Sequence, residues 1–210
     1  MIEDFDQAIQ ALEHDLLEMA SRAELMFVRA MDSLSRLDQS LAQEVVEADD
    51  KVDRLDARIE EKCLDLLSRS DPGGVDLRVV GAALKMITDI ERVGDLSVDI
   101  SRAAISIDRE LGASDVVDLP RIAEIARSMF HQSIEAYVRQ DPTAIANVLV
   151  NEDVVDGLFL ETRGQIHDLM RSHPDDVVTL SLLMIALHDI ERVADHAVNI
   201  AERVLAMIER

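Results

Sequence analysis

The chain has 210 residues, of which 48% are apolar and only 2% aromatic, so its core must be built from Leu, Ile, Val, Ala and Met. A formal net charge of −22 excludes nucleic acid and anionic membranes as favourable partners, because both require a surface rich in lysine and arginine. The same acidity would suit solubility or a high-salt interior. The scarcity of aromatic residues, proline and glycine favours long helices over a β-sandwich.

The first part of the chain predicts three helices, over residues 3–36, 39–70 and 75–111. Asp38 is expected to cap the second helix, and Asp71-Pro72 has the form of a cap followed by proline at the first helical position. An apolar stripe with spacings of three and four runs along the second helix through Leu41, Val45, Ala48, Val52, Leu55 and Ile59.

The second part predicts three more helices, over residues 119–139, 142–172 and 174–210. Asp141-Pro142 repeats the cap-and-proline pattern, and residues 112–120 form the best linker between the two parts. The last helix carries its own apolar stripe, through Leu183, Leu187, Ile190, Ala194, Ala197 and Ala201. Short connections imply antiparallel neighbours, so each part should be an up-down three-helix bundle.

An internal repeat supports this division. The segment Asp89-Ile-Glu-Arg-Val-Gly-Asp95 recurs as Asp189-Ile-Glu-Arg-Val-Ala-Asp195, at an offset of 100 residues. Upstream, Asp50-Lys-Val-Asp53 matches Asp153-Val-Val-Asp156 at an offset of 103, and the turn between the matched segments is shorter in the second copy. We therefore predict an all-α fold of two tandem three-helix bundles, over residues 1–112 and 113–210.

Other features indicate the cellular location. The N-terminal Met1-Ile-Glu-Asp-Phe-Asp is acidic and lacks the form of a signal peptide. The longest uncharged apolar stretch, Val177 to Leu187, is too short to span a bilayer. Cys63 is the only cysteine, so no disulfide within the chain and no thiolate zinc site can form, and its apolar neighbours predict a buried thiol. We expect a cytoplasmic protein that does not insert into membranes.

Each half contains two pairs of acids spaced four residues apart: Asp49/Asp53 and Glu91/Asp95 in the first, Glu152/Asp156 and Glu191/Asp195 in the second. This spacing places both carboxylates of a pair on one helical face, where they repel each other unless a cation neutralises them. Hard cations bind such oxygen ligands. The pairs are therefore candidate metal ligands.

The positions of the pairs relative to the turns strengthen this hypothesis. The pair 49/53 centres on residue 51 and 91/95 on residue 93, so their midpoint is Pro72, in the predicted turn. The corresponding midpoint of the second half falls between His173 and Pro174. The two pairs of each hairpin should thus be level, although the hand of the bundle decides whether they face each other. The alternative is a solvated acidic flank in which Arg92 pairs with Asp89 and Asp95, and Arg192 with Asp189 and Asp195.

Further polar residues continue these faces. Asp99 and Asn199 extend the two acidic faces by one turn, and Thr88 and His188 precede them. His188 is either a nitrogen ligand or a polar flank residue. His196 points to the other side of its helix and is expected to be a surface residue.

With these motifs the chain resembles the PhoU family of phosphate-signalling regulators, over nearly its whole length. The resemblance implies two three-helix repeats, homodimerisation and multinuclear metal, with iron first and Mg, Mn, Ca or Zn as other hard-cation choices. The implied ligands are Asp49, Asp53, Glu91, Asp95, Asp99, Glu152, Asp156, Glu191, Asp195 and Asn199. Asn199 stands where the first copy has Asp99, so the two sites should differ in charge.

The resemblance also implies a function. Members of that family couple a phosphate ABC transporter, through its ATPase subunit, to a sensor histidine kinase, and repress phosphate-starvation genes when phosphate is plentiful. An enzyme is disfavoured, because no His has the Glu three residues earlier that a ferritin-like di-metal site requires, and no phosphate-binding loop or nucleophile motif occurs. The remaining alternatives are an accessory protein of another phosphate or metal transporter and a purely structural helical adaptor.

Overall fold

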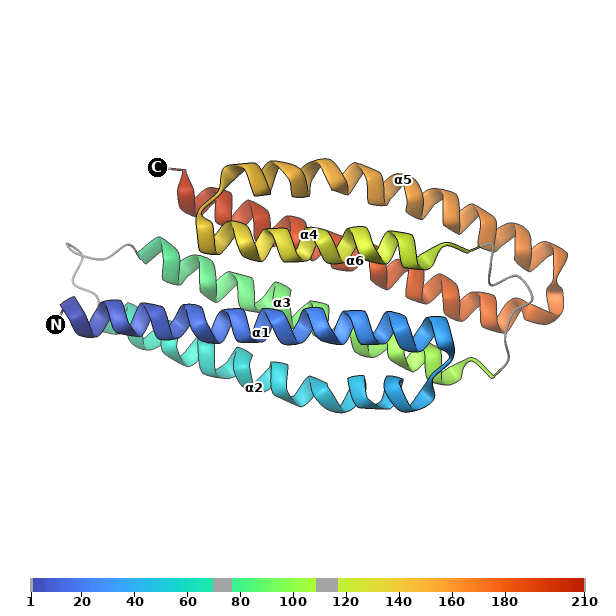
Figure 1. Cartoon of the computed structure of the whole chain (residues 1–210), viewed down its shortest axis with the longest axis horizontal. Helices are drawn as coiled ribbons and strands as arrows, with labels where there is room; N and C mark the ends of the chain where they lie inside the picture. Colours follow the sequence, from blue (N-terminus) through green and yellow to red (C-terminus); the bar gives the residue numbers. More distant parts are fainter. Residues whose placement is uncertain (1, 70–76, 109–116, 210) are drawn as a thin grey trace.

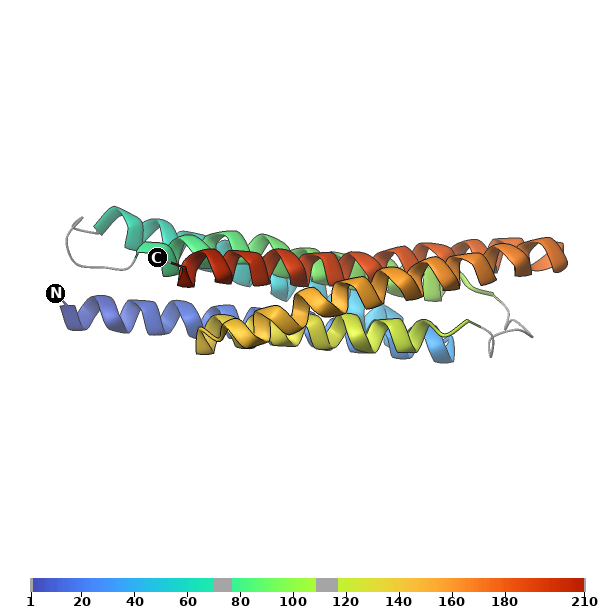
Figure 2. The same cartoon turned by 90° about the horizontal axis from the view of Figure 1, so that it is seen from above.

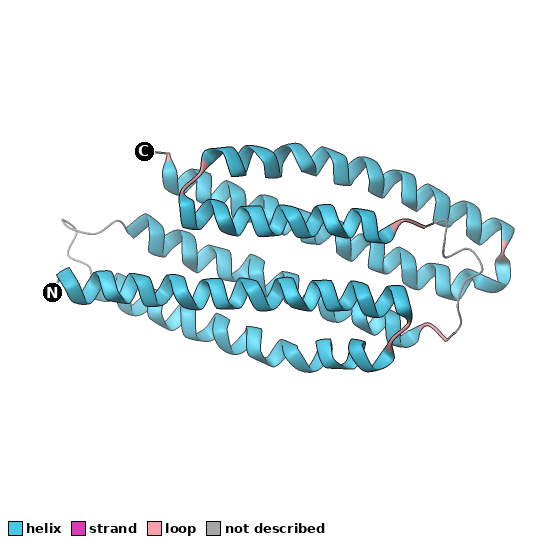
Figure 3. Cartoon of the chain, viewed as in Figure 1, coloured by secondary structure: helices cyan, strands magenta, loops and turns pink. Residues whose placement is uncertain are grey.

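The computed structural model describes residues 2–69, 77–108 and 117–209. Within these ranges it consists of helices without any strand (Figure 3), which confirms the all-α prediction. The helices are α1 (Ile2–Arg36), α2 (Gln39–Arg69), α3 (Leu77–Ser106), α4 (Leu119–Arg139), α5 (Pro142–Ser172) and α6 (Val177–Ile208), with a 3₁₀ turn η1 (Pro174–Asp176) before α6.

The helix boundaries follow the predicted caps. The backbone N–H of Leu41 donates to Asp38 Oδ1 at 3.0 Å, and that of Thr143 donates to Asp141 Oδ1 at 2.8 Å, so both predicted caps are confirmed. Asp118, which we placed inside the linker, caps α4 by accepting from the Arg121 N–H at 3.2 Å. The Asp71-Pro72 cap and most of the linker 112–120 lie outside the described residues.

Two predicted boundaries differ from the structure by three residues or more. The third helix ends at Ser106 rather than at residue 111, and Ile107 N–H makes the last helical hydrogen bond, to Ala103 O. The last α-helix begins at Val177 rather than at residue 174, because Pro174 starts a tighter turn in which Asp176 N–H donates to His173 O at 3.0 Å.

Aliphatic side chains fill the core of each three-helix bundle, with one fully buried phenylalanine in each half, Phe27 and Phe130. The predicted apolar stripes face inward, apart from Leu41, Ala48 and Leu183, which are only partly buried. Cys63 is buried as predicted, and this burial raises the pKa of its thiol to about 11, which keeps the thiol protonated and unreactive. Within the described ranges, no helix combines the length and apolar character needed to cross a membrane.

The two bundles lie side by side along their length (Figures 1 and 2). α3 and α6 run antiparallel against each other, α1 lies beside α4, and α2 and α5 form the two outer long edges. The offsets of the internal repeat relate α1, α2 and α3 to α4, α5 and α6. Because α3 and α6 are antiparallel, the two halves are related by an approximate twofold axis. A contact between one residue of α3 and one of α6 therefore has a counterpart between the equivalent residues of α6 and α3.

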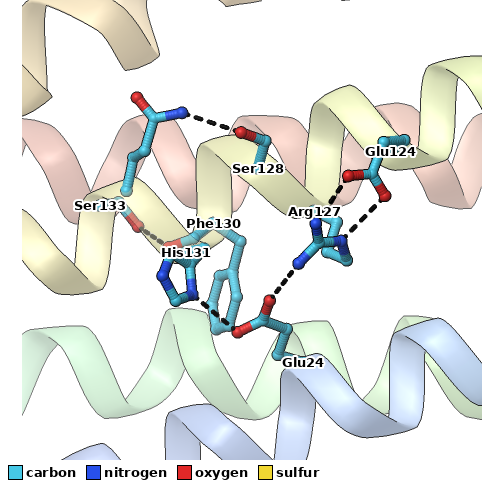
Figure 4. A network of polar contacts seen from close by, with 8 residues as sticks. Glu24, Glu124, Arg127, Ser128, Phe130, His131 and Ser133 are labelled. Atoms are coloured by element: carbon cyan, nitrogen blue, oxygen red, sulfur yellow. Dashed lines mark hydrogen bonds and ion pairs between the residues drawn. The ribbon is translucent and has the colours of Figure 1, made fainter.

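One polar network joins α1 to α4 (Figure 4). Glu24 on α1 accepts from Arg127 Nη1 at 2.7 Å, and its other carboxylate oxygen lies 3.1 Å from His131 Nδ1. Arg127 also donates twice to Glu124, and these bonds lower the pKa of the Glu124 carboxyl. Glu24 and Arg127 are separated by 103 residues, the offset of the repeat, so they occupy equivalent positions in the two halves. Their ion pair therefore lies at the centre of the contact between α1 and α4.

A second, buried network joins α3 to α6. The Asp89 side chain, only 5% exposed, lies 3.0 Å from His196 Nδ1, accepts from Asn199 Nδ2 at 3.3 Å and lies 2.7 Å from Arg203 Nε. The Arg203 contact is an ion pair rather than an aligned hydrogen bond, because its N–H does not point at the oxygen. His196 is therefore not the surface residue that we expected. Its side chain is 17% exposed because α3 covers that side of α6.

The counterpart of this network lacks its partners. Asp189 is also buried, but positions 96, 99 and 103 supply Leu, Asp and Ala where positions 196, 199 and 203 supply His, Asn and Arg. Asp189 Oδ2 has no hydrogen-bond partner, and burial together with the charge of Asp99 raises the pKa of this carboxyl to about 6. The equivalent aspartates thus have opposite environments, one neutralised and one not.

This difference predicts opposite effects of the same substitution. Asp89→Asn should lower the free energy of unfolding by about 2 kcal/mol, because Arg203 and His196 lose their buried counter-charge. Asp189→Asn should leave stability unchanged or raise it by up to about 1 kcal/mol, because it removes an uncompensated buried charge. Urea unfolding followed by circular dichroism at pH 7 measures both. Equal losses in the two variants would contradict this assignment.

Candidate metal-binding carboxylate clusters

The two acidic pairs of the first half lie next to each other across the α2–α3 hairpin. Burial, then the charges of Asp53 and Asp95, raise the pKa of Asp49 to about 6. The pKa of Glu91 on α3 is raised by burial, by Asp95 and by the α2 acids Asp56 and Asp53. Charges on one helix therefore act on carboxyls of the other, which confirms that the pairs are level. We call Asp49, Asp53, Glu91 and Asp95 the first cluster.

The second half repeats this arrangement across the α5–α6 hairpin. The pKa of Glu152 is raised by burial and by the charges of Asp156 and Asp195, and that of Asp195 by burial and by Asp156. The pKa of Glu191 is raised by burial and by Asp195, and the α5 residue Asp156 contributes as well. We call Glu152, Asp156, Glu191 and Asp195 the second cluster.

Local packing holds the first cluster close to the protein surface. Val52 is buried between Asp49 and Asp53, so the two acids emerge on the flank of a core-facing stripe. Gly94 lies under this flank: a Cβ placed on it would be 3.5 Å from Asp49 Oδ1. This is an ordinary van der Waals distance, so an alanine would also fit at this position. The matched position in the second half is Ala194.

Arginines surround the first cluster. A hollow of about 240 Å³ lies there, lined by Asp49, Asp95, Asp99, Leu96, Val98, Arg92, Arg102 and Arg192. Arg92 Nη1 lies 2.9 Å from Asp95, as predicted, and Arg102 Nη1 lies 3.1 Å from Asp99. Arg192 reaches this hollow from the other half of the molecule, so the charges of the two halves are intermixed.

Three expected ion pairs are not formed among the described residues. Arg92 pairs with Glu91 and Asp95 but not with Asp89, because Asp89 points into the interface with α6. Arg192 forms no ion pair with Asp189 or Asp195, although its charge offsets part of the rise in the pKa of both carboxyls. Ion pairs with neighbouring arginines therefore neutralise only some of the carboxylates on each acidic flank.

The structure adds members that the sequence analysis missed. Asp56, one turn beyond Asp53, acts on Glu91, and its own pKa is raised by burial, by Glu60 and by Asp53. The charge of Glu202 adds to the rise in the pKa of Glu152, whereas the charge of the matched Arg102 offsets part of the rise in the pKa of Asp49. The signal for Asp56 was its spacing of seven from Asp49. Glu202 could not be identified from sequence spacing, because only the packing of α5 against α6 brings it beside Glu152.

The remaining predicted positions fall into different environments. Asp99 is half-exposed and paired with Arg102, whereas Asn199 directs its amide to Asp89 in the interface between the halves. Thr88 is exposed. His188 is exposed, with Nδ1 3.9 Å from Glu191 Oε2, and its ring packs edge-on against Phe159 at 6.2 Å between centroids. Phe159 occupies the position that matches Asp56.

The donor chemistry of both clusters suits hard cations. Their side chains offer only carboxylate oxygens, which repel one another, so a bound cation would remove this repulsion. In the described part of the chain, no three His, Cys, Asp or Glu side chains converge closely enough to hold a metal ion as they stand. The acids lie on accessible flanks, with side chains 28% exposed at Glu91, 37% at Asp95 and 22% at Glu191.

Both halves also match known proteins. A family model described as the PhoU domain matches residues 16–104 and 119–204. The chain is 30% identical over 202 residues to the phosphate-specific transport system accessory protein PhoU homolog of Synechocystis sp., covering 95% of this chain and 89% of that protein. It is 27% identical to the homolog from Clostridium acetobutylicum, covering 97% and 94%.

A solved structure agrees with these matches. The crystal structure of PhoU from Pseudomonas aeruginosa superposes with a TM-score of 0.92 at 27% identity, and the match covers 97% of this chain and 98% of that one. Each of the two matched PhoU domains contains one carboxylate cluster at corresponding positions. The chain therefore belongs to the PhoU family.

Proposed function

We propose that this protein is a cytoplasmic negative regulator of phosphate uptake and of phosphate-starvation signalling. It acts by protein–protein contact, as a homodimer, with the ATPase subunit of a phosphate ABC transporter and with a sensor histidine kinase. The relatives named above are phosphate-specific transport system accessory proteins, which supports a role in phosphate transport. The observation that carries the proposal is the double PhoU-domain match, with one carboxylate cluster in each copy.

The proposal includes metal at both clusters. Asp49, Asp53, Glu91 and Asp95, extended by Asp99, would hold cations on the first hairpin. Glu152, Asp156, Glu191 and Asp195 would do so on the second, with Asn199 beside them and His188 as a possible nitrogen donor. Iron is our first choice, and other hard cations fit the same donors. Asp56 adds a carboxylate beside the first cluster and Glu202 adds one beside the second, where the first half has Arg102, so we expect the two clusters to differ in cation affinity.

The chain's own contribution is a rigid arrangement of charge. Cation-free clusters present concentrated negative charge on two helical hairpins, and bound cations would reverse part of that charge. A basic surface on a partner would therefore be attracted differently by the two states. Metal occupancy would thus tune which partner is held, without any chemical reaction on this chain.

Metal content tests the clusters directly. Asp53→Asn combined with Asp95→Asn should remove about half of the metal from protein saturated with ferrous or manganous ion, because one of two sites loses half of its carboxylates. Asp156→Asn with Asp195→Asn should remove the other half, and the fourfold variant nearly all. Elemental analysis after desalting measures this. Glu47→Gln with Asp65→Asn is the control of equal charge change, and a loss there equal to that of the cluster variants would refute the sites.

The raised pKa values predict a pH dependence for chelator-treated protein. A carboxyl whose pKa is raised in the folded state stabilises the fold when protonated, and this stability is lost as pH rises through the folded-state pKa. For Asp49 that loss falls between its ordinary value near 3.8 and about 6, and Asp56, Glu91, Glu152, Glu191 and Asp195 shift in the same direction. The free energy of unfolding should fall by about 1–3 kcal/mol between pH 5 and pH 7, on the scale of 1.4 kcal/mol per pKa unit reduced by solvent screening.

The measurement is urea unfolding at pH 5, 6 and 7, with chelator and then with a saturating divalent cation. Cation should restore stability at pH 7 and have little effect at pH 5, where protons compete for the carboxylates. The Asp53→Asn, Asp95→Asn variant should show a shallower pH dependence. A stability that rises from pH 5 to pH 7 in chelator would be inconsistent with the repulsion described above.

The regulatory role is tested in the host cell. Deleting the gene should switch on phosphate-starvation genes while phosphate is abundant, and a phosphatase reporter measures this. Re-expressing the wild-type chain should restore repression of the reporter. A reporter that stays silent in the deletion strain would exclude this role and would favour an accessory protein of another transporter.

A further inference from the structure

The outward side of α5 carries apolar side chains that none of the described residues covers. Val150 is 68% exposed, Val154 42% and Leu160 56%. Gly157 and Gly164 lie on the same side, and a Cβ placed on either would meet no atom within 4 Å. A glycine inside a helix costs roughly 0.5–1 kcal/mol relative to alanine. Packing within this chain therefore explains neither the exposed aliphatic residues nor the glycines. We call these five residues the α5 face.

The first half of the chain provides a matched comparison. The offset of 103 places the buried Val148 and Val155 of α5 on the buried Val45 and Val52 of α2, so the core sides of the two helices correspond. The outward sides do not. The α2 residues that match the α5 face are Glu47, Lys51, Arg54, Ala57 and Glu61.

The outward sides of α2 and α5 thus differ over this stretch. α2 has exposed leucines of its own, Leu64 and Leu67, but these lie beyond the stretch that matches the α5 face. α2 shows the ordinary pattern of a surface helix, apolar inside and charged outside, whereas the outward side of α5 carries exposed apolar side chains interspersed with Asp153 and Glu161. α5 forms an outer long edge of the molecule (Figures 1 and 2), and among the described elements α4, α6 and the short η1 turn pack against it. A further covering element would bury the outward apolar side chains.

The shape of the α5 face suits another helix. Its residues recur at spacings of three and four, which keeps them on one side of the helix over about four turns. Glycines seven residues apart create two shallow positions along this line, into which side chains of a crossing helix can pack at short interaxial distance.

The acidic residues around the α5 face favour a partner helix that carries basic residues. Asp153 and Glu161 are exposed along the same stretch of α5, and Glu152 and Asp156 of the second cluster lie on its neighbouring flank. A second copy of this chain would bring the same acids and a net charge of −22 to the contact, which opposes association through this face. Lysine or arginine beside an apolar stripe would instead pair with these acids.

We propose that the α5 face docks an amphipathic helix of another protein whose apolar stripe is flanked by basic residues. The inference deepens the proposed function, since it rests on action by protein contact and names the surface and chemistry of one partner. It does not depend on metal at either cluster. Binding in vitro and gene repression in the cell are separate readouts, so either can fail while the other succeeds.

The test uses the full chain and three labelled peptides of equal length. One has a leucine stripe with lysine and arginine flanks, the second has the same stripe with glutamate flanks, and the third has the composition of the first in an order without a stripe. Fluorescence anisotropy at physiological salt should show the first peptide binding at least about tenfold more tightly than either of the others.

Variants then locate the site. Val154→Lys with Gly157→Arg installs the residues of the first half and should weaken binding of the first peptide at least about tenfold. The reciprocal control, Lys51→Val with Arg54→Gly, should not weaken it. Circular dichroism verifies that both variants fold. Failure of the first peptide to bind, or equal binding to both variants, would overturn the proposal. So would sedimentation showing a dimer that Val154→Lys with Gly157→Arg dissociates, because a second copy would then cover the α5 face.

Discussion

Repulsion between carboxylates held level on two antiparallel hairpins is the constraint on which the rest of the site depends. The hydrophobic stripes of α2 and α5 fix the rotation of each helix, so the acids beside Val52 and Val155 cannot turn away from those on α3 and α6. Burial and neighbouring charge raise the pKa of Asp49 to about 6, and neighbouring arginines offset only part of this. The fold thus maintains an electrostatic strain that a cation can relieve, which connects core packing to the proposed metal binding.

The two repeats have diverged in the contacts that their equivalent residues make. In the interface between them, Asp89 receives His196, Asn199 and Arg203, while Asp189 faces Asp99 and has an unpaired oxygen. The substitution of Asn199 for a second aspartate is explained by this interface, because its amide donates to Asp89. The first cluster gains Asp56 where the second half has Phe159 packed against His188. Such asymmetry lets one fold present two clusters of different charge.

The outer edges show the same division. α2 is charged on its outward side and α5 carries exposed apolar side chains there, although the buried Val148 and Val155 of α5 match the buried Val45 and Val52 of α2. Acidic charge and apolar area thus lie next to each other on the second half. A partner that satisfies both needs basic and apolar groups on one helix, which links the proposed docking surface to the acidity of the whole chain.

The sequence by itself determined the all-α fold, the repeat and the level of the acid pairs, because apolar periodicity and turn position depend on local spacing. The ion pair between Arg92 and Asp95 was predictable for the same reason. Only the tertiary structure decided how the halves pack, and with it the burial of His196, the role of Asn199 and the arrival of Arg192 beside the first cluster. These depend on contacts between residues about one hundred positions apart, whose geometry is set by the packing of α3 against α6.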